Sequence, residues 1–328
     1  MHIKKVQHYG LAALLALAAS ALPLTAAAQA WPTAKPIRLI VNFPAGGSPD
    51  TVARAVAAPL SAALGQQVVV DNRAGAGGII GNDAAAKSPP DGYTFLMSSG
   101  SGMAIVPLIT PKMPFDAAKD LVPVAAGARL ELFLVVRADA PYKNFAEFIA
   151  HAKKNPGRLS YGSPGNGSSP HIGGEMLKSQ AGIFAVHIPY RGAGQALQDL
   201  LGGNVDYVLD PGIAFSHIKA GKLRLLAVAS VKRSFLFPDT PTLAELGLTG
   251  FDTGTTHGFW APTGTPAAVI ERLNREINRA LTMPAVVDAI RTLGAEPTPM
   301  TPAQFGDVIQ ADSRRYAAII KERKIVGD

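Results

Sequence analysis

Short apolar segments rich in β-branched residues alternate with longer segments whose apolar residues recur every three or four positions. The first segment predicts a strand at 36–43, and the helix predicted after it, at 49–64, carries one apolar stripe: Val52, Val56, Leu60 and Leu64. The alternation continues with strands predicted at 67–71, 93–98, 130–137, 159–162, 186–189, 205–209, 223–230 and 258–262, and with helices at 145–154, 170–180, 193–201, 213–220, 265–281, 284–293 and 301–324. Strands that alternate with helices build parallel sheets, so the pattern predicts an α/β fold.

The first 30 residues predict a signal peptide rather than part of the fold. A basic start precedes an apolar stretch of Ala and Leu at 11–24, and Ala28-Gln29-Ala30 then forms a small-residue cleavage site. The stretch is shorter than the roughly 20 residues that span a bilayer, although a retained membrane anchor is the alternative. The chain contains no cysteine, which excludes disulfides and a lipid-modified N-terminal cysteine. We therefore expect a protein of the periplasm, cleaved after Ala30.

Removal of 1–30 leaves residues 31–328, a length that exceeds what one hydrophobic core usually supports. We expect two domains, the first built from 31–132 and 232–328 and the second from 133–231. In this division the chain passes twice between the domains, which implies a hinge and a cleft.

The net charge and the absence of several sequence motifs reduce the number of possible functions. The net charge of +7 becomes +5 once Lys4 and Lys5 leave with a signal peptide that holds no acid. The basic residues at 314–324 are mixed with acids and lack interleaved aromatics, so we expect no nucleic-acid partner. Motifs of zinc proteases, P-loop proteins and hydrolase elbows are missing, and the histidines lack metal-ligand spacing. We therefore expect neither catalysis, a cofactor nor a metal.

A glycine-rich turn that leads into Ser and Pro occurs twice, at 45–50 and at 165–170, each time after a predicted strand. Ser is a favourable N-cap, and Pro suits the first helical position. Glycines allow backbone N–H groups to stand open at a helix N-terminus, where the helix dipole attracts an anion. Two such turns, one in each domain, predict a site that holds a small carboxylate between them. Ser99 and Ser101 follow the strand predicted at 93–98, at the sheet edge where ligands of parallel sheets collect.

The mature chain resembles, along its whole length, the periplasmic solute-binding proteins of tripartite tricarboxylate transporters, the Bug family. The motifs that carry the resemblance are Phe43-Pro44-Ala45-Gly46-Gly47, Asp71-Asn72-Arg73-Ala74-Gly75-Ala76-Gly77-Gly78, Pro90-Asp91-Gly92-Tyr93-Thr94, Gly165-Asn166-Gly167-Ser168, Pro189-Tyr190-Arg191-Gly192 and Ala261-Pro262-Thr263-Gly264-Thr265-Pro266.

The resemblance implies a type II periplasmic binding protein of the Venus-flytrap kind, with a ligand cleft between two domains. It implies a monomer that captures a small organic carboxylate (a di- or tricarboxylate, an acidic amino acid or an aromatic acid) and delivers it to the large and small membrane components of a transporter. The loops 43–50 and 163–169 match ligand loops of the family, and Arg191 and Asp210 match positions that line its cleft. With the two serines above, the candidate ligand contacts are Phe43, Ala45, Gly46, Gly47, Ser48, Ser99, Ser101, Ser163, Gly165, Asn166, Gly167, Ser168, Ser169, Arg191 and Asp210.

Several of these residues have an alternative role, and the protein has an alternative function. Ser48 and Ser169 serve equally well as plain caps, Arg191 as an exposed side chain, and Asp210 as a group that orients a loop. The chain departs from common family residues at Asn42, Ala45, Pro170 and Pro211, so the sequence leaves the particular carboxylate open. A receptor that docks a membrane sensor kinase instead of a transporter is the alternative function.

Overall fold

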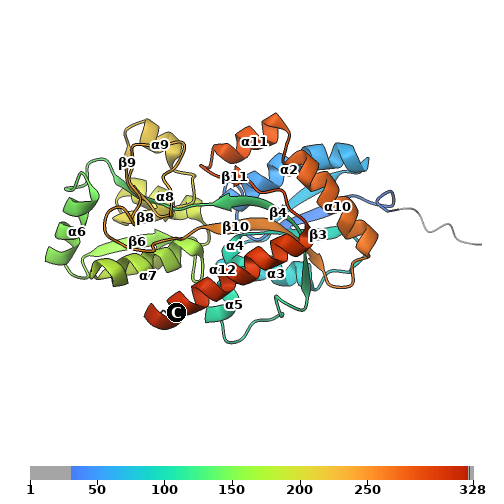
Figure 1. Cartoon of the computed structure of the whole chain (residues 1–328), viewed down its shortest axis with the longest axis horizontal. Helices are drawn as coiled ribbons and strands as arrows, with labels where there is room; N and C mark the ends of the chain where they lie inside the picture. The colour runs from blue at the N-terminus through green and yellow to red at the C-terminus, as the bar shows by residue number, and fades with distance from the viewer. Residues whose placement is uncertain (1–30, 324, 326–328) are drawn as a thin grey trace, which may run out of the picture.

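Two β-sheets, each flanked by helices, lie side by side in the computed structural model, which describes residues 31–323 and 325 (Figure 1). The signal peptide predicted at 1–30 lies outside these residues. The first sheet has the strand order β11-β4-β10-β3-β1-β2 and is formed by β1 (Ile37–Val41), β2 (Val68–Asn72), β3 (Thr94–Ser98), β4 (Leu121–Leu130), β10 (Thr255–Pro262) and β11 (Glu296–Pro297). The second sheet has the order β7-β6-β8-β5-β9 and is formed by β5 (Phe133–Arg137), β6 (Leu159–Ser163), β7 (Ala185–Pro189), β8 (Tyr207–Asp210) and β9 (Leu223–Val228).

Both sheets are mixed, whereas the alternation of elements predicts parallel ones. Strands β1, β2 and β3 pair in parallel, as do β6, β7 and β8. However, β10 runs antiparallel to β3 and β4, and β5 runs antiparallel to β8 and β9. The reversed strands are those that the chain enters when it passes from one sheet to the other, so the passage sets their direction. The single strand predicted at 130–137 is in fact two, because the chain leaves the first sheet at Leu130 and enters the second at Phe133.

Helices cover both sheets (Figure 1). In the first half these are α2 (Ser48–Leu64), a 3-10 turn (Ala76–Gly78), α3 (Ile79–Ala86), α4 (Gly100–Ala104), α5 (Val106–Ile109), α10 (Ala267–Ala280), α11 (Pro284–Arg291) and α12 (Pro302–Arg323). In the second half they are α6 (Phe145–Lys154), α7 (Ser169–Ala181), α8 (Ala193–Gly202) and α9 (Phe215–Lys219). None of these helices combines the length and the hydropathy that a bilayer crossing requires.

The stripe predicted on α2 is its buried face. Val52, Val56 and Leu60 have no exposed surface, and they pack in a core cluster with Leu39 of β1 and Phe259 of β10. Burial of such side chains contributes about 1.5–3 kcal/mol each. Pro59 lies inside the helix, yet the structure keeps one continuous helix from Ser48 to Leu64. The N-terminal end of α2 is thus anchored to the first sheet.

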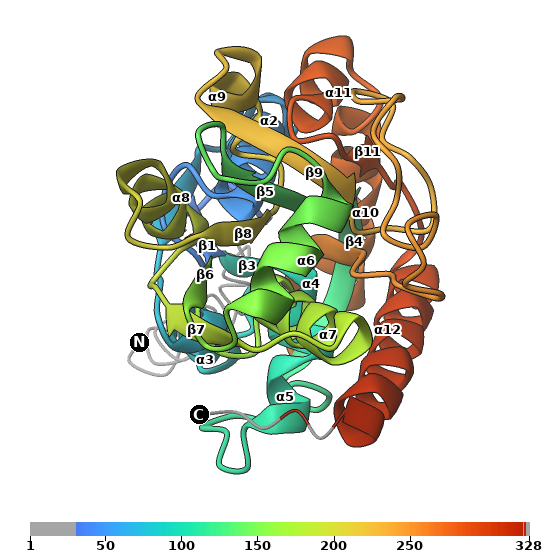
Figure 2. The same ribbon diagram turned by 90° about the vertical axis from the view of Figure 1, so that its left-hand side faces the viewer.

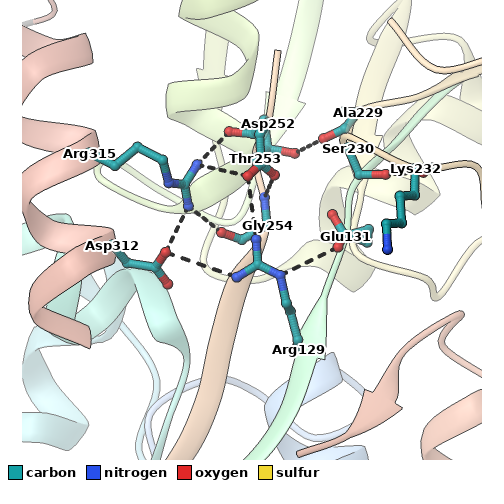
Figure 3. A network of polar contacts seen from close by, with 10 residues as sticks. All are labelled: Arg129, Glu131, Ala229, Ser230, Lys232, Asp252, Thr253, Gly254, Asp312 and Arg315. Carbon is teal, nitrogen blue, oxygen red and sulfur yellow. Dashed lines mark hydrogen bonds and ion pairs between the residues drawn. The ribbon is translucent and has the colours of Figure 1, made fainter. Parts of the chain in front are cut away.

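A polar cluster holds the two segments that join the sheets (Figure 3). The first crossover contains Glu131, and the second runs from the end of β9 to the start of β10. Arg315 of α12 donates to the carbonyl oxygens of Asp252 and Gly254, at 2.7 and 2.6 Å. Arg129 lies 3.6 Å from the Glu131 carboxylate and 3.4 Å from that of Asp252. Helix α12 also packs against β4 and α7, so it contacts both halves (Figures 1 and 2). The domain boundaries predicted above stay a prediction.

Candidate ligand cavity

A cavity of about 380 Å³ lies between the two halves, at the ends of β1, β3 and β6 and at the start of α8. Eight of the fifteen candidate contacts line it: Phe43, Ala45, Gly47, Ser48, Ser99, Ser101, Ser168 and Ser169. The structure therefore brings together the two glycine-rich turns and the serines that follow β3, although they come from three separate parts of the chain.

Seven candidates do not line this cavity: Gly46, Ser163, Gly165, Asn166, Gly167, Arg191 and Asp210. Three of the glycine N–H groups expected to stand open are used inside their own loops. Gly46 N–H donates to the Asp50 carboxylate, Gly165 N–H to Ser163 Oγ, and Gly167 N–H to His171 Nδ1. The glycines thus shape the turns, and a ligand contact for these seven residues stays a prediction.

Arg191 and Asp210 differ in burial. Arg191 is exposed. Asp210 is 2% exposed, and its carboxylate accepts from the N–H groups of Gly212 and Ala214. Burial raises the pKa of Asp210 to about 6, although these hydrogen bonds oppose the rise. Asp210 therefore stabilises the loop whose first residue, Pro211, lines the cavity.

Three helices begin at the cavity wall. Ser48 and Ser169 are the first residues of α2 and α7, and each is followed by proline. The N-caps are Gly47 and Ser168, so the expectation that Ser48 caps its helix and Pro49 begins it is wrong by one residue. Within the described residues, the N–H groups of Ser48 and Ser169 form no hydrogen bond, as geometry dictates for a first helical turn.

The third helix is α8, and its N-cap Gly192 and the residues after it line the cavity. The resemblance places Gly192, with Tyr190 and Arg191, among the positions that line the family's cleft, although Gly192 is not among the fifteen candidate contacts. A glycine that follows a strand and precedes a helix resembles the signal in the other two turns. Three further lining residues, Pro44, Pro49 and Pro164, lie within the predicted ligand loops. The lining residues missed from the sequence are Pro170, Ala193, Gly194, Gln195, Gln198, Pro211 and His257.

Hydroxyl and imidazole groups line the wall that belongs to the first half. Ser99 Oγ accepts from Gly102 N–H and lies 3.2 Å from Ser101 Oγ. Whichever of the two hydroxyls donates in that pair, one hydroxyl hydrogen is left over for a further acceptor. His257 of β10 is 4% exposed and contacts Ser48 Oγ through Nε2, at 3.1 Å.

Among residues 31–323 and 325, no Lys, Arg, Asp or Glu lines the cavity. The nearest buried carboxylate in the α2 turn, Asp50, lies behind the loop, where it accepts from Arg54, Asn72 and Gly46 N–H. Burial alone would raise the pKa of Asp50, but these hydrogen bonds outweigh it and hold the pKa below its usual value. A ligand in the cavity is therefore surrounded by dipoles rather than by formal charges.

The two halves contact each other directly around the cavity. A Cβ added to Gly192 would lie only 2.7 Å from Pro44 Cγ, and a Cβ added to Gly77 would strike the carbonyl group of Asn166. Such close approach, at positions where the sequence has glycine, places the two halves in direct contact beside the cavity.

Comparison with known proteins identifies the class. Residues 52–325 match the family described as the tripartite tricarboxylate transporter family receptor, TctC. Protein BugT of Bordetella pertussis is 42% identical over 311 residues, which cover 94% of each chain. The chain therefore belongs to the TctC, or Bug, family of periplasmic solute-binding receptors, which are not enzymes.

Solved structures show the same two-sheet fold. One described as a periplasmic transporter is 37% identical, with a TM-score of 0.87, and the alignment covers 90% of this chain and 99% of that one. An R. palustris protein with adipate is 34% identical, with a TM-score of 0.87 and the same coverage. MatC from Rhodopseudomonas palustris with bound malate is 30% identical, with a TM-score of 0.84, and the alignment covers 88% of this chain and 99% of that one.

Proposed function

We propose that this protein binds a small organic carboxylate in the cavity and delivers it, in the periplasm, to the membrane components of a tripartite transporter. The observation that carries the proposal is the convergence of α2, α7 and α8 on a cavity without charged side chains. Each helix has at least ten residues, so each contributes a full dipole at its N-terminus.

Helix N-termini suit a carboxylate for two reasons. The first-turn N–H groups lack partners in the helix, and the aligned peptide dipoles place about half a positive charge at that end. Hydrogen bonds from such donors to an ionised oxygen are roughly twice as strong as neutral ones. Ser48 and Ser169 each add a hydroxyl beside their N–H group, one from each half.

The arrangement favours an acid with two negatively charged ends and an apolar middle. One end would meet α2 in the first half, and the other would meet α7 and α8 in the second. Phe43 and several prolines also line the cavity, beside Ser99, Ser101 and His257, and they would contact the carbon atoms of such a ligand. The adipate and malate seen in two relatives are both dicarboxylates, which supports this class of ligand.

Binding is tested by thermal shift and calorimetry on the mature protein. The panel holds adipate, malate, citrate, aspartate, glutamate, nicotinate and phthalate isomers, with the diamide of adipic acid as an uncharged control. We expect at least one acid to bind with micromolar affinity, which corresponds to about 8 kcal/mol, and to raise the melting temperature. Failure of every acid, or equal binding of the diamide, would refute the proposal.

Delivery is tested separately. The ligand-loaded protein is added to vesicles that contain the large and small membrane components of a tripartite transporter from the same organism. We expect uptake of radiolabelled ligand that depends on the receptor. Binding without uptake, together with capture of a sensor kinase ectodomain, would support the signalling alternative instead.

A further inference from the structure

His257 is a buried polar residue whose two ring nitrogens both have partners. It lies on β10, just beyond the point where this strand pairs with Ser98 of β3. Gly100 N–H donates to Nδ1 at 3.1 Å, and Ser48 Oγ lies 3.1 Å from Nε2. The ring thus joins the loop after β3 to the first residue of α2. His257 and Ser48 are 209 positions apart in the sequence.

These two contacts determine which nitrogen carries the proton. A nitrogen that accepts from a backbone N–H must be unprotonated, so Nδ1 of His257 is the acceptor. In a neutral imidazole the proton then lies on Nε2, and Nε2–H donates to Ser48 Oγ. Burial lowers the pKa of His257 to about 3, so the ring keeps this neutral form at ordinary pH.

The hydroxyl of Ser48 is consequently left with its hydrogen free. Its oxygen accepts from His257, and within the described residues the side chain has no other hydrogen-bond partner. Ser48 lines the cavity, and its backbone N–H is also available at the start of α2. One residue therefore offers two donors toward a ligand, and His257 already occupies one of the two lone pairs of its hydroxyl oxygen.

We propose that His257 is a positioning residue that keeps the Ser48 hydroxyl hydrogen available for a ligand, so that this end of the cavity favours an ionised carboxylate over an amide or an ammonium group. The inference rests on the proposed function and deepens it. A carboxylate oxygen accepts from both Ser48 groups. An ammonium offers these two donors no acceptor, and a buried donor left unpaired costs affinity. A neutral amide oxygen accepts from them less strongly than an ionised carboxylate oxygen does.

Two substitutions separate the contacts of the ring. In His257→Gln the side-chain Nε2 takes the place of the histidine Nε2 and keeps a donor for Ser48. In His257→Asn the side-chain Oδ1 takes the place of Nδ1, which keeps an acceptor for Gly100 N–H but leaves Ser48 without its donor. A purely structural role would make the two variants similar, whereas the proposal makes them different.

The affinity test uses adipate and its monoamide as probes, with calorimetry on the mature protein. We expect His257→Gln to stay within about 3-fold of the wild type, and His257→Asn and Ser48→Ala each to weaken adipate binding by about 10- to 100-fold. The preference for adipate over the monoamide should shrink in both weakened variants. Adding His257→Asn to Ser48→Ala should cause little further loss, because both act through one hydrogen bond. Equal losses in the Gln and Asn variants, or additive losses in the double variant, would overturn the proposal.

A second measurement requires no ligand. In protein with ¹⁵N-labelled histidine, NMR should show the His257 proton on Nε2 and an unprotonated Nδ1 from pH 8 to pH 5. A proton on Nδ1 would overturn the inference even if carboxylates bind. Conversely, the expected tautomer in a protein that binds none of the acids would refute the proposed function and leave the hydrogen-bond geometry intact. Circular dichroism and melting temperatures of each variant confirm that the fold is retained.

Discussion

The substitution Gly192→Ala should prevent the two halves from closing fully. Gly192 caps α8 and has an extended φ of −172°, a conformation that alanine adopts without strain. Its new Cβ would lie 2.7 and 2.8 Å from Pro44 Cγ and Cδ, whereas ordinary contacts fall at about 3.5–4.0 Å. Overlap of this size in packed structure costs about 1–3 kcal/mol.

The cost falls on the closed state alone, because the two residues separate when the halves open. If the ligand binds by stabilising the closed form, the dissociation constant should rise by about 5- to 150-fold. The melting temperature without ligand should change little, since an open arrangement relieves the overlap.

Calorimetry with the best ligand from the panel measures the affinity, and small-angle scattering reports closure on ligand addition. Gly202→Ala is the matched control, because it lies at the other end of α8 and its Cβ would have an ordinary 3.5 Å contact with Asn204. Wild-type affinity in Gly192→Ala, or an equal loss in Gly202→Ala, would refute the reasoning about closure.

Three further predictions concern stability and pH. Burial raises the pKa of Glu131 to about 7, so ionisation of this carboxyl lowers the free energy of unfolding as the pH rises above about 4.5. In urea titrations, Glu131→Gln should therefore stabilise the protein by up to about 3 kcal/mol at pH 8, but not at pH 4.5. Arg315→Lys should destabilise by about 1–2 kcal/mol in the same assay, because lysine cannot hold both carbonyl groups of the second crossover, whereas the exposed Arg314→Lys should be neutral. Among the described residues that line the cavity, His257 is titratable, and it stays neutral down to about pH 3. Above the raised pKa values of Asp210 (about 6) and Glu131 (about 7), affinity for a fully ionised acid should therefore not change between pH 8 and 9; a tenfold change in calorimetry would contradict this.

The parts of the fold that could be predicted are those set by local pattern. The apolar stripe on α2 is buried as its spacing indicates, because the spacing of apolar residues within one helix is enough to identify its buried face. The break between β4 and β5 left no comparable signal, since the apolar run around Glu131 contains no turn residue. There the chain changes sheets, and that change depends on how the two halves pack.

The candidate site shows the same division. The turns before Ser48 and Ser169 could be found because glycine, serine and proline mark a helix start. The sequence did not show that His171 would occupy an N–H group of its own turn, although it lies four residues after Gly167. His257 could not be assigned, because its partner Ser48 is distant in sequence and the contact exists only in the folded chain.

If the cavity binds a dicarboxylate as proposed, and since no Lys or Arg among the described residues lines it, ligand length should determine how fully the two halves close. Asp50 carries a negative charge in the first turn of α2, but Arg54 lies 2.9 Å from its carboxylate and compensates it, so the ligand experiences the helix dipole. The donors at the starts of α2 and α7 are fixed to different sheets, and their separation therefore changes only when the halves move. An acid that is too short would contact one set of donors and leave the halves open, and one that is too long would hold Pro44 away from Gly192. Either mismatch loses the closed-state contacts, so discrimination among dicarboxylates should follow chain length more closely than the chemistry of the carbon between the two ends.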